Sequence, residues 1–147
     1  MSNQPILIVE DEHIVAEDIK QTLISLGYRV VGIAASAEEA LEKVAKDKPQ
    51  LALMDIKIKG KIDGIETASL LYQNYGVPVV YLTAHADDET LSRAVKTSPY
   101  GYILKPFDEV ELKVCLQLAF HKICREADGS LTEDQISIKH SPDSSAA

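Results

Sequence analysis

Five polar residues stand where apolar runs of the sequence end, and together they have the chemistry of a phosphoryl-transfer site. They are Glu10, Asp11, Asp55, Thr83 and Lys105. Three carboxylates in one cleft repel each other unless a cation lies among them, and oxygen donors with open coordination positions suit Mg²⁺. A carboxylate held beside such an ion can attack a phosphoryl group and form an aspartyl phosphate. A cation and a hydroxyl donor would complete the site, and Lys105 and Thr83 have those side chains.

Each of these residues also has an ordinary structural explanation. An acid or a threonine after a strand often caps the next helix, and a lysine often lies in a solvated loop. The hypothesis therefore rests on the five positions taken together. It requires the ends of several apolar runs to meet in space, which depends on the fold.

Five short apolar runs are separated by stretches with helical periodicity. The predicted strands are residues 6–9, 30–34, 51–54, 79–82 and 102–104. Their almost unbroken apolar character is typical of parallel strands that are buried on both faces. The apolar positions of the first two predicted helices repeat at helical spacing and are Val15, Ile19, Leu23 and Leu26, then Leu41, Val44 and Ala45.

Capping pairs mark the starts of three helices. They are Ser36 with Glu39, Asp63 with Glu66, and Asp108 with Glu111. A shorter, more polar helix is predicted near residues 87–96. Only Leu91, Ala94 and Val95 are available there to be buried, so this helix has the weakest apolar face of the set.

The alternation of strands and helices predicts a single α/β domain. We expect a doubly wound, five-stranded parallel sheet of flavodoxin-like order 2-1-3-4-5 with helices on both faces, because right-handed crossovers place a helix between parallel neighbours. In such a sheet the ligand site lies beyond the carboxyl ends of the strands, where the winding reverses between the first and third strands. Asp55 directly follows the third strand and is therefore expected at that point.

The composition limits the partners of the chain. Its 147 residues suffice for one compact domain, and a net charge of −8 offers no basic surface to nucleic acid or to an anionic membrane. The N-terminus lacks the features of a signal or membrane-spanning segment, so a cytoplasmic location is expected. We expect the domain over residues 1–124, followed by a polar, disordered tail or truncated linker over residues 125–147.

Five motifs of the sequence identify a family. In chain order, "ILIVEDE", "LMDI", "DGIE", "VVYLTA" and "GYILKPF" resemble the receiver domain of two-component response regulators, of the single-domain, chemotaxis-regulator type. The resemblance covers about residues 5–124. It implies that Asp55 is the phosphoacceptor. A sensor histidine kinase, a phosphotransfer protein or a small phosphodonor would supply the phosphoryl group, as in a phosphorelay.

The resemblance also implies a metal site. Asp11 and Asp55 would bind Mg²⁺, or Mn²⁺ in its place, directly and together with the backbone carbonyl of Lys57, while Glu10 would act through water. The loop that carries Lys57, "KIKGKIDG", is about one residue longer than the commonest family form and lacks its proline. This departure affects the expected placement of the Lys57 side chain and none of the acidic positions.

The remaining family positions concern the response to phosphate. The resemblance implies that Thr83 and Lys105 bind phosphoryl oxygens and that Tyr102 is an aromatic switch coupled to Thr83. The peptide bond between Lys105 and Pro106 is a candidate for the cis isomer. Without the resemblance, a tyrosine in a strand would be read as core filling.

We expect this protein to transmit a signal and not to produce a metabolite. The phosphoryl transfer and its autohydrolysis would modify the protein itself, so we expect a switch and not an enzyme with external substrates. Output would be contact with a downstream protein or with a second copy of the chain. The expected surface comprises the helix near residues 87–96, the strand 102–104 and the next helix, with contacts from Leu91, Val95, Tyr100, Tyr102 and Lys113.

Two other classes of protein fit less well. A Mg²⁺-dependent phosphohydrolase of the haloacid-dehalogenase type also uses an aspartate nucleophile, but its general acid lies two residues after the nucleophile, where this chain has Lys57. A dinucleotide-binding module needs a glycine-rich turn after the first strand, and this chain has "EDEHIV" there. The phosphohydrolase is the nearer alternative.

Overall fold

A computed structural model describes residues 3–128, in which strands and helices alternate along the chain. The strands are β1 (Pro5–Val9), β2 (Arg29–Ala34), β3 (Leu51–Met54), β4 (Val79–Thr83) and β5 (Gly101–Leu104). The helices are α1 (His13–Ser25), α2 (Ala37–Lys46), α3 (Gly64–Tyr75), α4 (Asp88–Val95) and α5 (Glu109–Ala127). Each predicted strand agrees with an observed one to within one residue at either end.

The described chain falls into two compact units that divide within α5, one ending at Lys113 and the other beginning at Val114. The sheet and every candidate site residue belong to the first unit. The second unit contains the rest of α5, which continues to Ala127 and so runs three residues beyond the expected end of the domain at residue 124. Most of the predicted tail, residues 129–147, lies outside the described residues.

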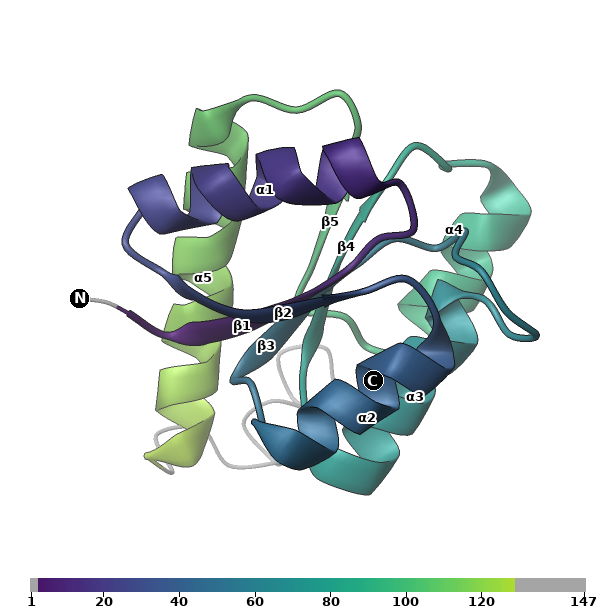
Figure 1. The fold of residues 1–147 in the computed structure, drawn as a ribbon, viewed down its shortest axis with the longest axis horizontal. Helices are drawn as coiled ribbons and strands as arrows, with labels where there is room; N and C mark the ends of the chain where they lie inside the picture. The colour runs from purple at the N-terminus through teal and green to yellow at the C-terminus, as the bar shows by residue number, and fades with distance from the viewer. Residues whose placement is uncertain (1–2, 129–147) are drawn as a thin grey trace, which may run out of the picture. The chain divides into compact units, whose positions relative to one another are not determined.

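The five strands form one parallel sheet in the order β2-β1-β3-β4-β5, which confirms the predicted topology (Figure 1). The register pairs Val9 of β1 with Met54 of β3. The next residues along the chain are Glu10 and Asp55, so both leave the sheet at the same level. The point where the winding reverses therefore carries two carboxylates side by side.

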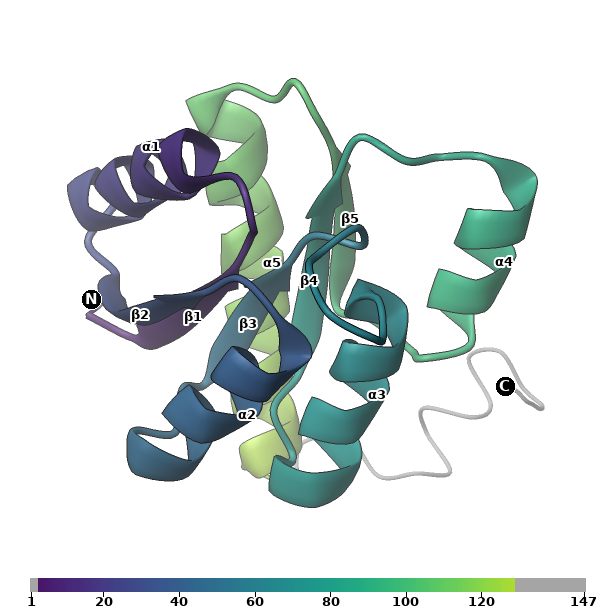
Figure 2. The ribbon, with the colours of Figure 1, turned by 45° about the vertical axis from the view of Figure 1, so that its right-hand side comes forward.

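Helices cover both faces of this sheet. Figure 2 shows α2 and α3 on one face and α1 on the opposite face. Alternate residues of β1, β3 and β4 point to the same side, and there they pack with apolar residues of α2, α3 and α4. The main members of this core are Leu7, Val9, Ala52, Met54, Val79 and Tyr81 from the strands, and Ala40, Val44, Ile65, Ala68, Leu71 and Ala94 from the helices.

The central strands differ from the edge strands in burial. Every residue of β3 and β4 is buried, as their apolar sequences predicted. The same prediction is wrong for β2 and β5, in each of which only one residue is buried. These two strands lie at the edges of the sheet, where each has only one neighbouring strand.

The buried stripes of two helices lie slightly away from the predicted positions. In α1 the predicted positions Ile19 and Leu23 are buried, but the third buried residue is Ala16, and Val15 is only half-buried. In α2 Ala40 is buried and Ala45 is exposed. A helical repeat leaves the exact face open to a rotation of about one residue, and docking on the sheet decides it.

The predicted helix caps are confirmed. The side chains of Ser36, Asp63 and Asp108 each accept a hydrogen bond from the backbone N–H three residues later, at 3.3, 3.0 and 2.8 Å. Glu111 completes a reciprocal box by accepting from the backbone N–H of Asp108 at 3.0 Å. Within residues 3–128, no helix has both the length and the apolar character needed to cross a membrane.

Candidate functional site

Three charged side chains meet beyond the carboxyl ends of β1, β3 and β5. The Lys105 Nζ atom lies 2.6 Å from Glu10 Oε1 and 3.1 Å from Asp55 Oδ2. The Glu10 side chain is 2% exposed, that of Asp55 11% and that of Lys105 17%. A single ammonium group thus bonds to two carboxylates, and balances the charge of one of them, in a cleft that is largely closed to solvent.

Burial and charge act against each other in this cluster. Burial raises the pKa of Glu10 and the nearby Asp55 carboxylate adds to this, while the bonds from Lys105 and from the Glu12 backbone oppose it. Burial alone would lower the pKa of Lys105, but its bonds to Glu10 and Asp55 outweigh that effect and raise it. Lys105 therefore keeps its proton firmly and serves as the cation of the cleft.

The donors available at this edge fit a divalent cation. Asp55 Oδ1 is buried and has no hydrogen-bond partner, so it is an acceptor without a donor. Asp11, next to Glu10, is half-exposed, and Lys57 lies exposed in the loop after β3. No three acidic, histidine or cysteine side chains of residues 3–128 form a ready-made metal group. Oxygen donors of this kind suit Mg²⁺, which keeps several waters and needs few protein ligands.

The backbone around Asp55 is fixed by close contacts. The backbone N–H of Asp55 donates to the carbonyl of Val9 at 2.9 Å, and the N–H of Gly64 donates to the carbonyl of Ile56 at 2.6 Å. A Cβ atom on Gly64 would lie only 2.0 Å from the carbonyl oxygen of Asp55. The first turn of α3 can approach the acceptor residue this closely because Gly64 has no side chain.

The long loop after β3 is also anchored. The backbone N–H of Lys59 donates to the carbonyl of Ala35 at 3.1 Å, and Lys59 forms an isolated parallel bridge with Ser36. This contact ties the loop that carries Lys57 to the start of α2. A backbone contact with the residues just before α2 therefore holds the loop.

Thr83 and Tyr102 meet at one residue of the loop after β4. Thr83 is fully buried, and its Oγ1 accepts a hydrogen bond from the backbone N–H of His85 at 3.3 Å. The Tyr102 hydroxyl donates to the backbone carbonyl of His85. The two predicted switch residues are thus linked through one peptide segment, and the half-buried Tyr102 ring faces that loop.

Lys105 is held at the base of its own loop. Its backbone N–H donates to the carbonyl of Thr83 at 2.9 Å, which extends the β4–β5 pairing by one residue. The peptide bond between Lys105 and Pro106 is cis, the isomer that the family resemblance implied. Lys105 and Thr83 therefore start from neighbouring positions at the edge of the sheet.

Sequence reasoning missed one residue that borders the site, Tyr81, and the backbone contacts of another, His85. The backbone of His85 links Thr83 to Tyr102, and Tyr81 lies beneath the Tyr102 ring with a centroid distance of 5.7 Å. The missed signal was present for Tyr81, which lies two residues before Thr83 and so on the same face of β4. The position of His85, two residues after Thr83, predicted that it borders the site, but its contacts use backbone atoms and no residue type signals them.

Comparison with known proteins identifies the family. The model of the response regulator receiver domain matches residues 6–117. The transcriptional regulatory protein PdtaR of Mycobacterium tuberculosis is 35% identical over 114 residues, which cover 78% of this chain and 55% of that protein. The chain spans about half the length of the curated relatives it matches.

Solved structures agree with this result. The signal receiver domain of a modulated diguanylate cyclase from Desulfovibrio desulfuricans G20 superposes with a TM-score of 0.78 at 37% identity, covering 83% of this chain and 97% of that one. A CheY-like receiver domain protein from Methanospirillum hungatei JF-1 gives a TM-score of 0.77 at 29% identity, covering 85% and 99%. These comparisons give no support to a phosphohydrolase of the haloacid-dehalogenase type. The chain belongs to the receiver-domain family of two-component response regulators.

Proposed function

We propose that Asp55 is the phosphoacceptor of this receiver domain. The observation that carries the proposal is its buried carboxylate, with Oδ2 on Lys105 and Oδ1 without a partner. In the reaction, a carboxylate oxygen of Asp55 attacks the phosphorus atom, and the bond from phosphorus to the donor breaks. The donor is a phosphohistidine nitrogen or the acyl oxygen of acetyl phosphate. Water later hydrolyses the acyl phosphate and releases inorganic phosphate.

Receiver domains are signalling switches in general, and the chemistry proposed here fits that role. The protein would modify only itself, by accepting the phosphoryl group and by losing it through autodephosphorylation. We assign this function to a receiver domain over residues 1–124, of which the family model matches residues 6–117.

The proposed cofactor is Mg²⁺, with Mn²⁺ as its substitute. Asp11, Asp55 and the backbone carbonyl of Lys57 would hold the ion, and Glu10 would act through a bound water. When bound, the ion neutralises the acidic edge and the charge that develops on the transferring group. Lys105 holds Glu10 and Asp55 in place, and its long, flexible side chain lets its ammonium group turn to a phosphoryl oxygen.

The proposed switch consists of Thr83 and Tyr102. A phosphoryl group on Asp55 would attract the Thr83 hydroxyl, whose oxygen accepts from the His85 N–H at 3.3 Å. The peptide segment at His85 would then move, and Tyr102 bonds to its carbonyl. A change at the acceptor can thus reach β5 through two hydrogen bonds. The energy difference between the two states need be only a few kcal/mol for both to be populated.

The proposed partners are proteins. Receiver domains interact with histidine kinases or phosphotransfer proteins, and one of these would be the donor here. Output would use the face of α4, β5 and the start of α5, toward a downstream target or a second copy of the chain. Its residues would be Leu91, Val95, Tyr100, Tyr102 and Lys113. Support comes from Val95, which is 65% exposed and apolar on a helix with little burial.

Labelling with acetyl phosphate tests the proposal. Wild-type protein should incorporate phosphate at Asp55 with Mg²⁺ and lose this ability in excess chelator, because the acidic edge then repels an anionic donor. Asp55→Asn should abolish the label. Thr83→Ala should still accept it, since the threonine does not provide the nucleophile. Mass spectrometry of the intact protein measures all three.

An exposed acid outside the cleft provides the control. Asp47→Asn removes a carboxylate that is 53% exposed at the end of α2, and it should label as the wild type does. Undiminished label in Asp55→Asn, or in the presence of chelator, would contradict the proposal.

A further inference from the structure

Helix α4 is held to the domain by unusually little apolar burial. Ala94 is its one buried residue, Leu91 is half-buried, and Val95 is 65% exposed. The sequence offered Val95 both as a residue to bury and as a contact of the output surface, and the helix turns it to solvent. With so little apolar contact, the polar contacts of α4 have a larger share in setting its position.

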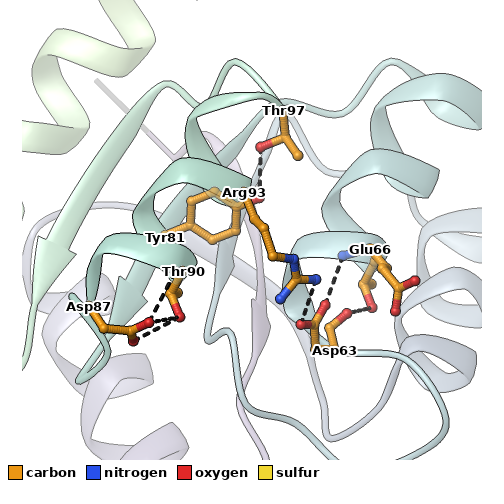
Figure 3. A network of polar contacts seen from close by, with 8 residues as sticks. Asp63, Glu66, Tyr81, Asp87, Thr90, Arg93 and Thr97 are labelled. Atoms are coloured by element: carbon orange, nitrogen blue, oxygen red, sulfur yellow. Dashed lines mark hydrogen bonds and ion pairs between the residues drawn. The ribbon is translucent and has the colours of Figure 1, made fainter.

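One of these polar contacts reaches the core of the sheet. The Tyr81 hydroxyl on β4 lies 2.8 Å from Thr97 Oγ1, just past the C-terminal end of α4 (Figure 3). Thr97 Oγ1 in turn donates to the carbonyl of Ala94 at 2.6 Å. The threonine hydroxyl has one proton and uses it for Ala94, so Tyr81 must be the donor to Thr97. The chain of bonds therefore runs outward, from the core to the last turn of α4.

The same tyrosine lies against the proposed switch. Tyr81 and Tyr102 are paired in the β4–β5 register, and their rings lie 5.7 Å apart with an interplanar angle of 55°. Tyr81 is fully buried, so its ring cannot move aside freely. Burial raises the pKa of Tyr81 to about 12, which leaves its hydroxyl protonated and able to donate throughout the physiological range.

A second polar contact of α4 is more exposed. Figure 3 shows the Arg93 side chain reaching from α4 to Asp63, the N-cap residue of α3. Their nearest atoms are 2.9 Å apart, and the side chains are 43% and 30% exposed. Water screens a pair of this kind, so it contributes less than a buried hydrogen bond.

We propose that Tyr81 is a positioning residue that transmits the state of Tyr102 to α4 through its hydrogen bond to Thr97. When the Tyr102 ring moves, the packing against the Tyr81 ring changes, and the hydroxyl of Tyr81 shifts the end of α4. The inference rests on the proposed function and adds to it a second connection to the output face. The connection through His85 acts on the loop before α4, whereas the bond from Tyr81 to Thr97 acts just after the C-terminal end of α4.

Hydrogen exchange of the α4 amides with and without beryllofluoride and Mg²⁺ tests the inference. Tyr81→Phe removes only the hydroxyl and keeps the ring, so the fold should be retained. Its α4 amides should exchange about five-fold faster than those of the wild type, as expected for one lost hydrogen bond. The decisive quantity is the ratio of exchange rates with and without beryllofluoride. At the amides of the last turn of α4 this ratio should fall toward one in Tyr81→Phe, because the connection through Tyr81 is lost there while the connection through His85 remains.

Four further variants make the result specific. Thr97→Val removes this bond and also the bond to the Ala94 carbonyl, so its α4 amides should exchange faster still, while its exchange ratio should fall as in Tyr81→Phe. Thr97→Ser keeps a hydroxyl and should behave like the wild type. Combining Tyr81→Phe with Thr97→Val should add nothing to the effect of Thr97→Val alone. Tyr72→Phe on α3, where the tyrosine is 55% exposed, is the matched control and should leave the exchange ratio unchanged.

The outcomes separate this inference from the proposed function. If Tyr81→Phe exchanges faster but keeps the wild-type ratio, the bond is only structural and the inference is wrong. Beryllofluoride could change the exchange of the Thr83 and Lys105 amides in both the wild type and Tyr81→Phe, while the α4 exchange ratio is the same in the two proteins. In that case the inference fails and the proposed function stands. If beryllofluoride leaves the wild-type cleft unchanged, the proposed function fails and this inference fails with it.

Discussion

At the scale of single residues, the cleft depends on how one ammonium group is shared. Lys105 bonds to Glu10 and Asp55, from which it is separated by 95 and 50 positions in the chain. Its Nζ atom has three donor hydrogens, so it can hold both carboxylates and still address a third acceptor. The remaining free atom of the cluster, Asp55 Oδ1, marks where a new positive charge or an incoming electrophile is best accommodated.

The glycine beside the acceptor provides the prediction at this scale. Gly64→Ala would put a Cβ atom 2.0 Å from the carbonyl oxygen of Asp55 and 2.8 Å from Ile56 Cα. Both contacts are with backbone, so the loop or the start of α3 must move. We expect a loss of about 2–3 kcal/mol in the free energy of unfolding, and slower labelling of Asp55. Urea unfolding and acetyl phosphate labelling measure the two effects.

A second glycine gives a matched control. A Cβ atom on Gly32 of β2 would meet only the Lys43 side chain, 2.9 Å away at Cδ. A flexible lysine can move aside, so Gly32→Ala should change stability by less than about 1 kcal/mol and leave labelling intact. Equal behaviour of the two variants would show that close approach at Gly64 is unimportant.

At the scale of elements, α4 differs from α2 and α3. Three residues of α2 and five of α3 are buried, and in α4 only Ala94 is. A helix with a small buried face can shift at low free-energy cost, since few apolar contacts are lost. The position of α4 therefore depends on its polar contacts with β4 and with the N-cap residue of α3.

The ion pair between α4 and α3 gives the prediction at this scale. We expect a double-mutant cycle of Arg93→Ala and Asp63→Asn to show a coupling of about 0.5 kcal/mol, typical of a partly exposed pair. Asparagine retains the side-chain oxygen with which Asp63 caps α3, so the cycle measures the ion pair without the loss of the helix cap. Urea unfolding in low salt measures the coupling, which should shrink in 1 M salt.

The Arg29–Asp47 pair is the control. Its nearest atoms are 3.3 Å apart, and its side chains are more exposed, at 45% and 53%. The same cycle there should give a coupling close to zero, because looser geometry and greater exposure both weaken the pair. A coupling at Arg93–Asp63 no larger than this one would mean that the pair does not hold α4.

At the scale of the whole molecule, the protein is acidic, and some of its carboxylates are gathered in one cleft. The net charge is −8, and two of the carboxylates that contribute to it lie side by side at the carboxyl ends of β1 and β3. Self-repulsion of this kind opposes the compact state, and bound cations relieve it. The proposed metal therefore links function to stability.

Metal binding should raise the melting temperature. At about ten times its Kd, Mg²⁺ should add about 1.4 kcal/mol to the free energy of unfolding, because it binds the folded state alone. For a domain of this size that corresponds to roughly 3–5 °C. Asp55→Asn should lose most of the shift, and Asp47→Asn should keep it. Calorimetry with and without Mg²⁺ measures the effect.

Ionic strength must be matched in this measurement. Salt screens the net negative charge and can stabilise the protein without any site. An equal shift in NaCl of the same ionic strength, or an equal shift in Asp55→Asn, would show general screening in place of a bound ion.

The sequence alone determined the fold class and the edge where the site lies. Apolar runs of strand length, helical repeats and capping pairs are local signals, and each is read within a few residues. Together with the handedness of crossovers they leave few topologies. Because carboxyl ends of parallel strands share one edge, Asp55 and Lys105 could be placed near each other without coordinates.

The tertiary structure decided which atoms meet. The sharing of Lys105 between Glu10 and Asp55, the bond from Tyr81 to Thr97 and the exposure of Val95 depend on strand register, helix rotation and side-chain rotamers. These quantities are fixed by packing between elements that are distant in the chain. No local preference of a residue determines them, and for this reason the residues that connect the cleft to α4 emerge only in the folded protein.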